Sequence, residues 1–325
     1  MAGGYIRARN RSLSSQLTTY QERALQRFIS GLPKNSTKIL ELGSDLEANV
    51  VKRLTSVTGC EVVGINPAPN FPAVRPNEDI SSKVQLMRTD GLTIPLADES
   101  IDGVFTVATV EHVLDLNLFY SEIQRVLKPG GVLFASFEPI WSSGLGHHTY
   151  AVLGEKEARY WKPGRNPVPD FAHLLWTADE MRSFLLQGPC DNALVEPIVE
   201  WIYEGDGVNR VFLEEHLGSL EHSELTIERL HLVRGVPPDP LTESRLLSMY
   251  GVERSFDVSG VEVTMRKCVS RRQLYSSALR RFYHCYYGEV IGLVRLTSPL
   301  LRRSRTIRRV LNRRWLKNEM HIVTE

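Results

Sequence analysis

The chain has few cysteines, and no two of them lie close together. Four occur in 325 residues, at Cys60, Cys190, Cys268 and Cys285, and none forms a CxxC pair. This spacing argues against a zinc site and against a disulfide framework, and it favours reduced thiols in a cytosol. We therefore expect a cytoplasmic protein.

Long apolar runs and repeats are also missing. No stretch of about 18 apolar residues occurs, so the sequence predicts no membrane span. Residues 1–15 contain arginines but no apolar core, which is unlike a secretory signal. The apolar fraction of 42% and the charged fraction of 24% are those of an ordinary globular protein. No internal repeat suggests a solenoid or an array.

The net charge of +1 hides an asymmetry along the chain. Residues 271–325 hold 13 lysines and arginines against 3 acidic residues, a net +10, so residues 1–270 carry −9. The basic segment predicts an amphipathic helical tail. Such a tail packs back onto the acidic body, lies on an anionic membrane face or docks on a partner. We expect packing first and peripheral membrane contact second. Without a zinc-finger, RNP-like or helix-turn-helix signal, nucleic acid is not an expected partner.

Short apolar segments alternate with amphipathic ones in the first half of the chain. The patterns predict strands at 38–42, 60–65, 83–89, 101–108 and 132–137, and helices at 13–31, 46–57 and 116–127. Strand–helix alternation with short turns predicts an α/β fold, a doubly wound, mostly parallel sheet with helices on both faces. Ligands of such sheets bind at the carboxyl ends of the strands.

The pattern changes after residue 138. Residues 139–176 are rich in proline, glycine, tryptophan and histidine without a clear period, and we interpret them as an inserted loop region beside the site. Thr177 and Glu180 then have the spacing of a capping box that opens a helix. A closing antiparallel strand pair with a helical insertion is predicted farther on, at 225–235, 260–269 and near 240–250.

One stretch, residues 84–139, carries several motifs in a fixed order. It contains the acid-plus-small pair Asp90-Gly91, then "IPLADESID", the "EH" pair Glu111-His112, a helix and "RVLKPGG". This order resembles that of the class I S-adenosylmethionine-dependent methyltransferases, in their small-molecule, type 11-like branch. The resemblance implies a seven-stranded Rossmann-like methyltransferase fold, methyltransferase activity and S-adenosyl-L-methionine as the cofactor.

The resemblance is strong over residues 36–138 and loose beyond them. It suggests an N-terminal helical extension at 1–35 and a methyltransferase domain at 36–270. Within that domain, residues 139–176 would form a substrate-side insertion. The basic helical tail would then occupy residues 271–325.

The loop after the first strand departs from the family pattern. The family reads acid-x-Gly-x-Gly-x-Gly, and the sequence here is "ELGSDLE" at 41–47, with one glycine, Gly43. Asp45 and Glu47 would stand at a helix N-terminus, where their charges repel an anionic pyrophosphate. They would not repel a cofactor that carries a sulfonium and an ammonium. The loop therefore disfavours NAD and permits S-adenosylmethionine.

The resemblance also implies which residues contact the cofactor. Asn66 stands where the family has an acid that grips the ribose, and Asp90 fits the family acid near the adenine amino group. Each has a plainer alternative: Asp45 as a helix cap, Asn66 and Asp90 as turn residues. The altered loop leaves open a non-catalytic, methyltransferase-like binding module. The predicted cofactor contacts are Glu41, Gly43, Asp45, Asn66, Asp90, Gly91 and Glu111.

The acceptor is suggested by residues 138–153, 166–176 and 201–210. These segments are similar to those of a methyltransferase subgroup associated with polysaccharide and other glycan biosynthesis. Tryptophan rings offer flat apolar faces that suit sugars, and three occur here, at Trp141, Trp161 and Trp176. We expect O-methylation of a sugar hydroxyl or of another small acceptor. The predicted substrate contacts are Trp141, His173 and Trp176.

Three histidines cluster in the same region, at His147, His148 and His173. One of them could serve as the general base that removes a hydroxyl proton, and of the adjacent pair at most one could do so. The cluster could instead bind a divalent metal with Glu138 or Asp170, or simply hold a long loop by hydrogen bonds. A further candidate base beside the cofactor is His112, which alternatively packs at a helix start. We name His147, His148 and His112 as candidate catalytic residues and no metal ligand.

Overall fold

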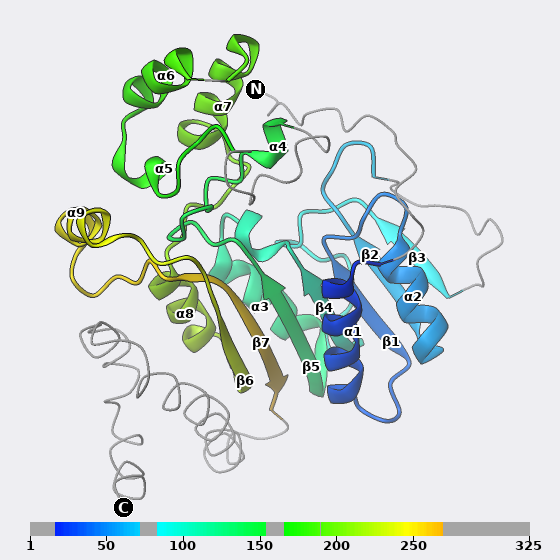
Figure 1. Ribbon diagram of the computed structural model, residues 1–325. Helices are drawn as coiled ribbons and strands as arrows, with labels where there is room; N and C mark the ends of the chain where they lie inside the picture. The colour runs from blue at the N-terminus through cyan, green and yellow to red at the C-terminus, as the bar shows by residue number, and fades with distance from the viewer. Residues whose placement is uncertain (1–16, 72–82, 154–165, 189, 269–325) are drawn as a thin grey trace, which may run out of the picture.

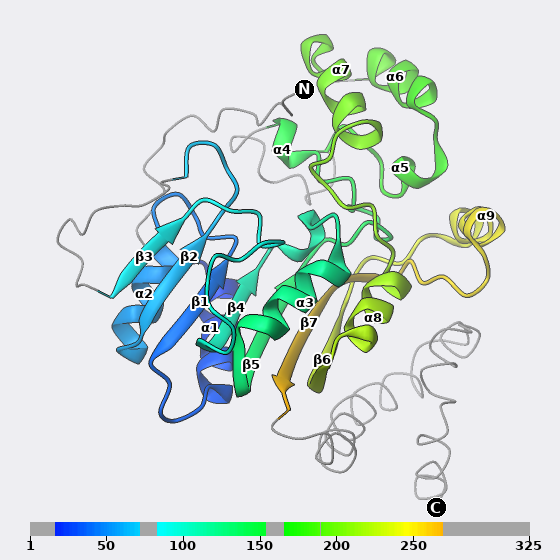
Figure 2. The same ribbon diagram turned by 180° about the vertical axis from the view of Figure 1, so that it is seen from behind.

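The computed structural model describes residues 17–71, 83–153, 166–188 and 190–268. Figures 1 and 2 show a central sheet with helices on both faces and a further group of helices beyond one end of the strands. The predicted basic tail at 271–325, residues 1–16 of the N-terminal extension and Trp161 lie outside the described residues.

The described strands form a seven-stranded sheet in the order β3-β2-β1-β4-β5-β7-β6. Strands β1 to β5 pair in parallel, and β7 is antiparallel to both β5 and β6. This confirms the predicted doubly wound, mostly parallel sheet, and it matches the Rossmann-like methyltransferase fold. The strands are β1 Lys38–Leu42, β2 Glu61–Ile65, β3 Val84–Met87, β4 Ile101–Val107, β5 Leu127–Phe137, β6 Leu225–Arg234 and β7 Val258–Lys267.

Successive apolar residues of the inner strands bury both faces of the sheet. In β1, Ile39 and Leu40 point to opposite faces, and both are fully buried. Helices α1 Thr19–Gly31 and α2 Asn49–Thr58 cover the Ile39 face. Helices α3 Leu116–Val126 and α8 Leu213–His222 cover the other (Figures 1 and 2). A sheet buried on both faces requires this nearly continuous apolar sequence.

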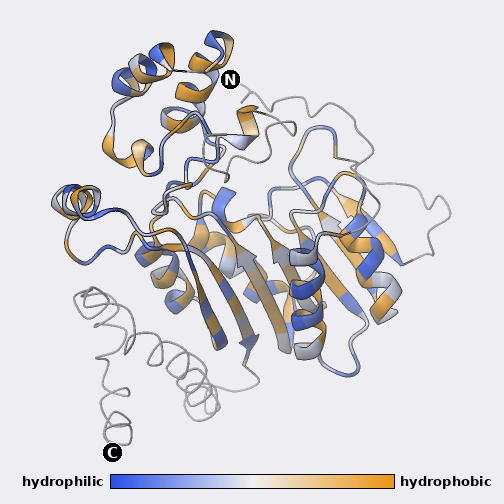
Figure 3. Ribbon diagram, in the orientation of Figure 1, coloured by the Kyte–Doolittle hydropathy of each residue, from blue (hydrophilic) through white to orange (hydrophobic). Residues whose placement is uncertain are grey.

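A separate group of helices stands above the carboxyl ends of the parallel strands (Figure 1). We call it the helical cap; it comprises α4 Tyr150–Leu153, α5 Ala172–Leu175, α6 Ala178–Gln187 and α7 Asn192–Tyr203. The cap has its own apolar core, and Figure 3 shows the hydrophobic sides of its helices. The predicted capping box opens α6. The cover over the strand ends is thus larger than the predicted loop region, because α6 and α7 share one core with Trp141, Val168, Phe171 and Leu174.

The closing strand pair also follows the prediction. Between β6 and β7 the chain forms α9 Pro240–Tyr250, capped by Asp239 and packed against the cap through Tyr250, whose hydroxyl donates to the Leu174 carbonyl at 2.7 Å. Within the described ranges, no helix is both long and apolar enough to cross a membrane.

Candidate active site

The loop between β1 and α2 is drawn tightly against the neighbouring strand ends. The backbone N–H groups of Gly43 and Ser44 both donate to the Ile65 carbonyl at the end of β2, at 2.9 and 3.0 Å. Gly43 has φ +84°, and a Cβ there would lie 1.9 Å from the Thr109 hydroxyl oxygen beyond β4. The single glycine of this loop is therefore required by packing as well as by backbone conformation.

Asp45 caps α2. The residue before α2 is Ala48, which has no capping side chain. The Asp45 carboxylate instead accepts from the backbone N–H groups of Asn49 at 2.9 Å and Val50 at 3.3 Å. The chain's own carboxylate thus occupies the positive end of the helix, where a pyrophosphate would have to bind. These bonds fit the capping alternative, and a cofactor contact from Asp45 stays a prediction.

The next two strands end in turns that involve predicted cofactor residues. The Asn66 amide donates to the Ser44 carbonyl at 2.7 Å, and its oxygen accepts from the Ala68 N–H at 2.7 Å. Asp90 is exposed beyond β3 and accepts from the Leu92 N–H at 2.9 Å, and Gly91 has φ +77°. Both polar side chains stabilise turns, as their plainer alternative predicts, and both remain at the edge where a cofactor would bind.

Two carboxyl groups are buried at the carboxyl ends of the strands, and one oxygen of each has no hydrogen-bond partner in the protein. Glu41 in β1 is 4% exposed and Glu111 beyond β4 is 1% exposed, and the Oε2 atom of each lacks a hydrogen bond. Burial raises the pKa of each to about 8. Two more unpartnered hydroxyls, of Ser44 and Thr106, lie in the same strand ends. Such groups suit a ligand that brings positive charge and donors, and they oppose an anionic one.

His112 and His148 meet at the boundary between the sheet and the cap. Their ring centroids are 5.1 Å apart. His112, in the 3-10 helix Val110–His112, donates from Nδ1 to the Gly207 carbonyl at 2.5 Å, which leaves Nε2 as an acceptor. His148 donates from Nε2 to the Pro139 carbonyl at 2.6 Å, and its Nδ1 is buried without a partner. Burial lowers the pKa of both, that of His148 to about 3.

His147 and His173 lie deeper in the cap, with ring centroids 5.3 Å apart. His147 is fully buried; its Nδ1 accepts from the Thr149 N–H at 3.3 Å, and its Nε2 lies 3.3 Å from the Asn166 amide. His173 donates from Nε2 to the Trp141 carbonyl at 2.9 Å. Burial lowers the pKa of His147 well below its usual range and that of His173 to about 4. These contacts fit the loop-holding alternative for both residues.

The predicted tryptophans pack within the cap. Trp141 is 7% exposed; the His173 ring lies 4.6 Å from its ring, and the Arg210 guanidinium lies 5.7 Å away. Trp176 is half-buried beside Phe184, with centroids 4.9 Å apart. A stacking role for either ring toward a sugar stays a prediction.

The structure adds residues that the sequence did not single out as cofactor or substrate contacts. Tyr20 of α1 lies across the end of β5, where its hydroxyl is 2.7 Å from the Ser136 hydroxyl. Glu138, which follows β5, is half-buried, and burial raises its pKa. A polar residue directly after a parallel strand is a usable signal for Glu138. Nothing marks Tyr20, because its contact spans 116 residues.

In the part of the chain that the structure covers, no group of three or more His, Cys, Asp or Glu side chains could hold a metal ion.

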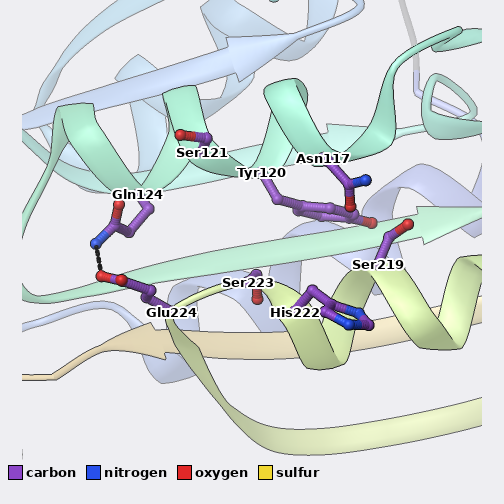
Figure 4. A pocket seen from close by; sticks show the side chains of 8 residues that line it. All are labelled: Asn117, Tyr120, Ser121, Gln124, Ser219, His222, Ser223 and Glu224. Atoms are coloured by element: carbon purple, nitrogen blue, oxygen red, sulfur yellow. Dashed lines mark hydrogen bonds between the residues drawn. The ribbon is translucent and has the colours of Figure 1, made fainter.

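A groove of about 500 Å³ lies between helices α3 and α8 (Figure 4). Gln124 donates to Glu224 across this groove at 2.8 Å. Its lining is Asn117, Tyr120, Ser121, Gln124, Ser219, His222, Ser223 and Glu224.

The buried groups predict a stability maximum between about pH 4.5 and 6.5. The buried imidazoles have lowered pKa values in the folded protein, so below pH 6.5 the unfolded chain binds more protons than the folded one. The free energy of unfolding therefore decreases as the pH is lowered below 6.5. Glu41 and Glu111 keep their protons up to about pH 8 when folded, so stability falls as pH rises from 4.5 to 8. Between pH 6.5 and 8 the carboxyl effect acts alone, and Glu111→Gln is expected to weaken this fall. Melting temperatures of both proteins test this, and a midpoint that rises from pH 6.5 to 8 contradicts it.

Sequence comparisons with known proteins agree with the motif order. Residues 40–135 match the sequence model of a family described as "Methyltransferase domain". The chain is 32% identical over 115 residues to the sterol 24-C-methyltransferase erg6 of Schizosaccharomyces pombe, covering 34% of this chain and 29% of that protein. It is 31% identical over 124 residues to an uncharacterized methyltransferase of Mycobacterium sp. (strain KMS), covering 36% and 48%.

A solved structure with a similar arrangement is the geranyl diphosphate C-methyltransferase of Streptomyces coelicolor A3(2), which contains Mg²⁺, geranyl diphosphate and S-adenosyl-L-homocysteine. Its TM-score is 0.42 and its identity 12%, over 78% of this chain and 83% of that chain.

Residues 40–135 thus carry a methyltransferase domain, and the motif order and the sheet resemble those of the class I S-adenosylmethionine-dependent methyltransferases. The chain spans between about a quarter and a half of the length of the curated relatives named above.

Proposed function

We propose that the protein transfers a methyl group from S-adenosyl-L-methionine to a hydroxyl of a small acceptor, a sugar or glycan unit, bound between the strand ends and the helical cap. The observation that carries the proposal is the pair of buried carboxyls, Glu41 and Glu111, each of which has one oxygen, Oε2, without a hydrogen-bond partner. They stand beside a loop whose anion site is already occupied by Asp45.

The residues at this edge fit the proposed cofactor by charge. Glu41 would hold its ammonium, Asn66 the ribose, and Asp90 with Gly91 the adenine end. When bound, this cofactor supplies a methyl group that is already activated by its sulfonium. The protein's part is then to hold the acceptor in line and to remove a hydroxyl proton.

Among the candidate bases, His112 is best supported. Its Nδ1 proton is fixed by the Gly207 carbonyl, so Nε2 carries the lone pair, and its lowered pKa keeps the ring neutral at pH 7. His148 is a weaker base, since its pKa is about 3. His147 is engaged through both ring nitrogens.

Calorimetric titration with S-adenosylhomocysteine tests the cofactor site. This ligand keeps the ammonium, so binding at pH 7 should ionise a buried carboxyl and release protons. We expect micromolar affinity and an observed enthalpy that differs between two buffers of different ionisation enthalpy. Glu41→Gln should lose the buffer dependence, and the distant Glu224→Gln should keep it.

The rival is a methyltransferase-like binding module without cofactor. It is favoured by one observation: Asp45 and Asn66 are both engaged in bonds to the chain itself. A folded protein that shows no heat with S-adenosylhomocysteine would support this module and contradict the proposed enzyme.

A further inference from the structure

A second set of polar groups lies at the carboxyl ends of β4 and β5, beyond the predicted cofactor edge. We call it the acceptor box, and it consists of Tyr20, Glu111, His148, Glu138 and Tyr150. The register pairs Val107 of β4 with Ser136 of β5. The chain segments that follow the two strands therefore leave the sheet side by side.

The two carboxylates of the box lie close together. Burial raises the pKa of Glu111, and the nearby charge of Glu138 raises it further. Gly260 of the adjacent strand β7 leaves room for Glu138, because a Cβ on Gly260 would lie 2.5 Å from the Glu138 Cβ. The fold thus accommodates a second acid next to a first one that is already buried.

Aromatic rings border these carboxylates. The Tyr20 hydroxyl is held at 2.7 Å by Ser136, two residues before Glu138. The Tyr150 ring from the cap lies 5.7 Å from the His148 ring; burial raises the pKa of Tyr150, and the charge of Glu111 raises it further. Faces of aromatic rings attract cations, and they do so more strongly when water is excluded.

The two acidic groups of the box have no cationic partner within the described residues. The ion pairs found there leave out Glu111 and Glu138, whereas Glu262 on the neighbouring strand pairs with Arg27. Glu111 is 1% exposed and its Oε2 has no partner. A buried carboxyl with a free oxygen is costly unless a ligand completes it.

Apart from Glu111, which was also predicted to contact the cofactor, the box is separate from the strand ends that would hold the cofactor. The loops that would hold the cofactor follow β1, β2 and β3, whereas Glu138 follows β5, two strands from β1. Strands are about 4.8 Å apart, so the two places differ by roughly 10 Å across the sheet. A cation at Glu41 therefore does not neutralise Glu138.

We propose that the acceptor box binds a positively charged amine, so that the acceptor is a hydroxyl compound that also carries an ammonium group, such as an amino sugar. This inference rests on the proposed function and makes it more specific. The ammonium would lie between Glu111 and Glu138 against the tyrosine and histidine rings, and the hydroxyl would face His112.

Binding of tetramethylammonium tests the box without any turnover. We would titrate the protein, saturated with S-adenosylhomocysteine, with tetramethylammonium and with neutral tert-butanol, and follow the melting temperature. Wild type should be stabilised by the cation and not by the alcohol. Glu138→Gln should weaken the cation effect about tenfold in apparent affinity, a typical loss for a desolvated cation site, and the matched variant Glu224→Gln should leave it unchanged.

Three results would overturn the inference: equal effects of cation and alcohol, wild-type behaviour of Glu138→Gln, or loss of the cation effect when S-adenosylmethionine replaces S-adenosylhomocysteine. The last would mean that the sulfonium itself occupies the box. Failure of the proposed function is distinguishable, because S-adenosylhomocysteine would then not bind, while tetramethylammonium can still be titrated into the free protein.

Discussion

Replacing Gly43 with alanine is expected to lower the free energy of unfolding by about 3 kcal/mol. The new Cβ would lie 1.9 Å from the Thr109 hydroxyl oxygen and 3.0 Å from the Thr109 Cβ, and the backbone has φ +84°. Urea unfolding of both proteins measures the loss. Because the loop joins the ends of β1, β2 and β4, we also expect weaker binding of S-adenosylhomocysteine.

Two further variants separate the cost of the backbone conformation from the cost of the clash with Thr109. Gly59 at the end of α2 has φ +71° and open space around it, so Gly59→Ala reports the backbone cost alone, about 1 kcal/mol. Thr109→Ala removes two of the three clashing atoms, so it should recover part of the loss in the double variant. Equal losses for Gly43→Ala and Gly59→Ala would show that the contact with Thr109 does not matter.

The second large effect is expected at His112. Glutamine at this position keeps an N–H donor for the Gly207 carbonyl but cannot accept a proton at neutral pH. His112→Gln should reduce kcat by a factor of about 10² to 10⁴, the usual contribution of a general base. The affinity for S-adenosylhomocysteine should not change. The exposed His222→Gln serves as the control, and its kcat should equal that of wild type.

The pH dependence gives an independent check on His112. Burial lowers its pKa below 6.5, so the ring is already a competent base at neutral pH. The acid limb of the kcat profile should therefore lie below pH 6.5, with no further rise above pH 7. This limb should vanish in His112→Gln. A limb that persists there would assign the base to another group.

The sequence predicted the fold well where one pattern continued over many residues. Helix α3 begins at Leu116 as its apolar spacing predicts, and the helix within the closing strand pair is found as α9. The cap was predicted less completely. Helices α4 and α5 have only four residues each, too few for a period, and α7 contains Pro197 in its interior.

The candidate site, like the fold, could be predicted from the sequence only in part. Motif order placed Glu41 and Glu111 at neighbouring strand ends, where the structure buries both. The motif could not decide whether Asp45 and Asn66 face a ligand or the backbone, because both roles use the same residue types at the same positions. Tyr20 and Glu138 came together only through packing of α1 across β5, a contact without any local signal.

The position of β7 bears on how the chain reaches this structure during synthesis. β7 is the last described strand in the sequence, yet it lies inside the sheet and joins β5 to β6. Until the ribosome has released residues 258–267, one edge of β5 is open and β6 has no described strand to pair with. Open edges of this kind pair readily with other chains. A chain that stops before Val258 would therefore aggregate rather than persist as a smaller folded enzyme.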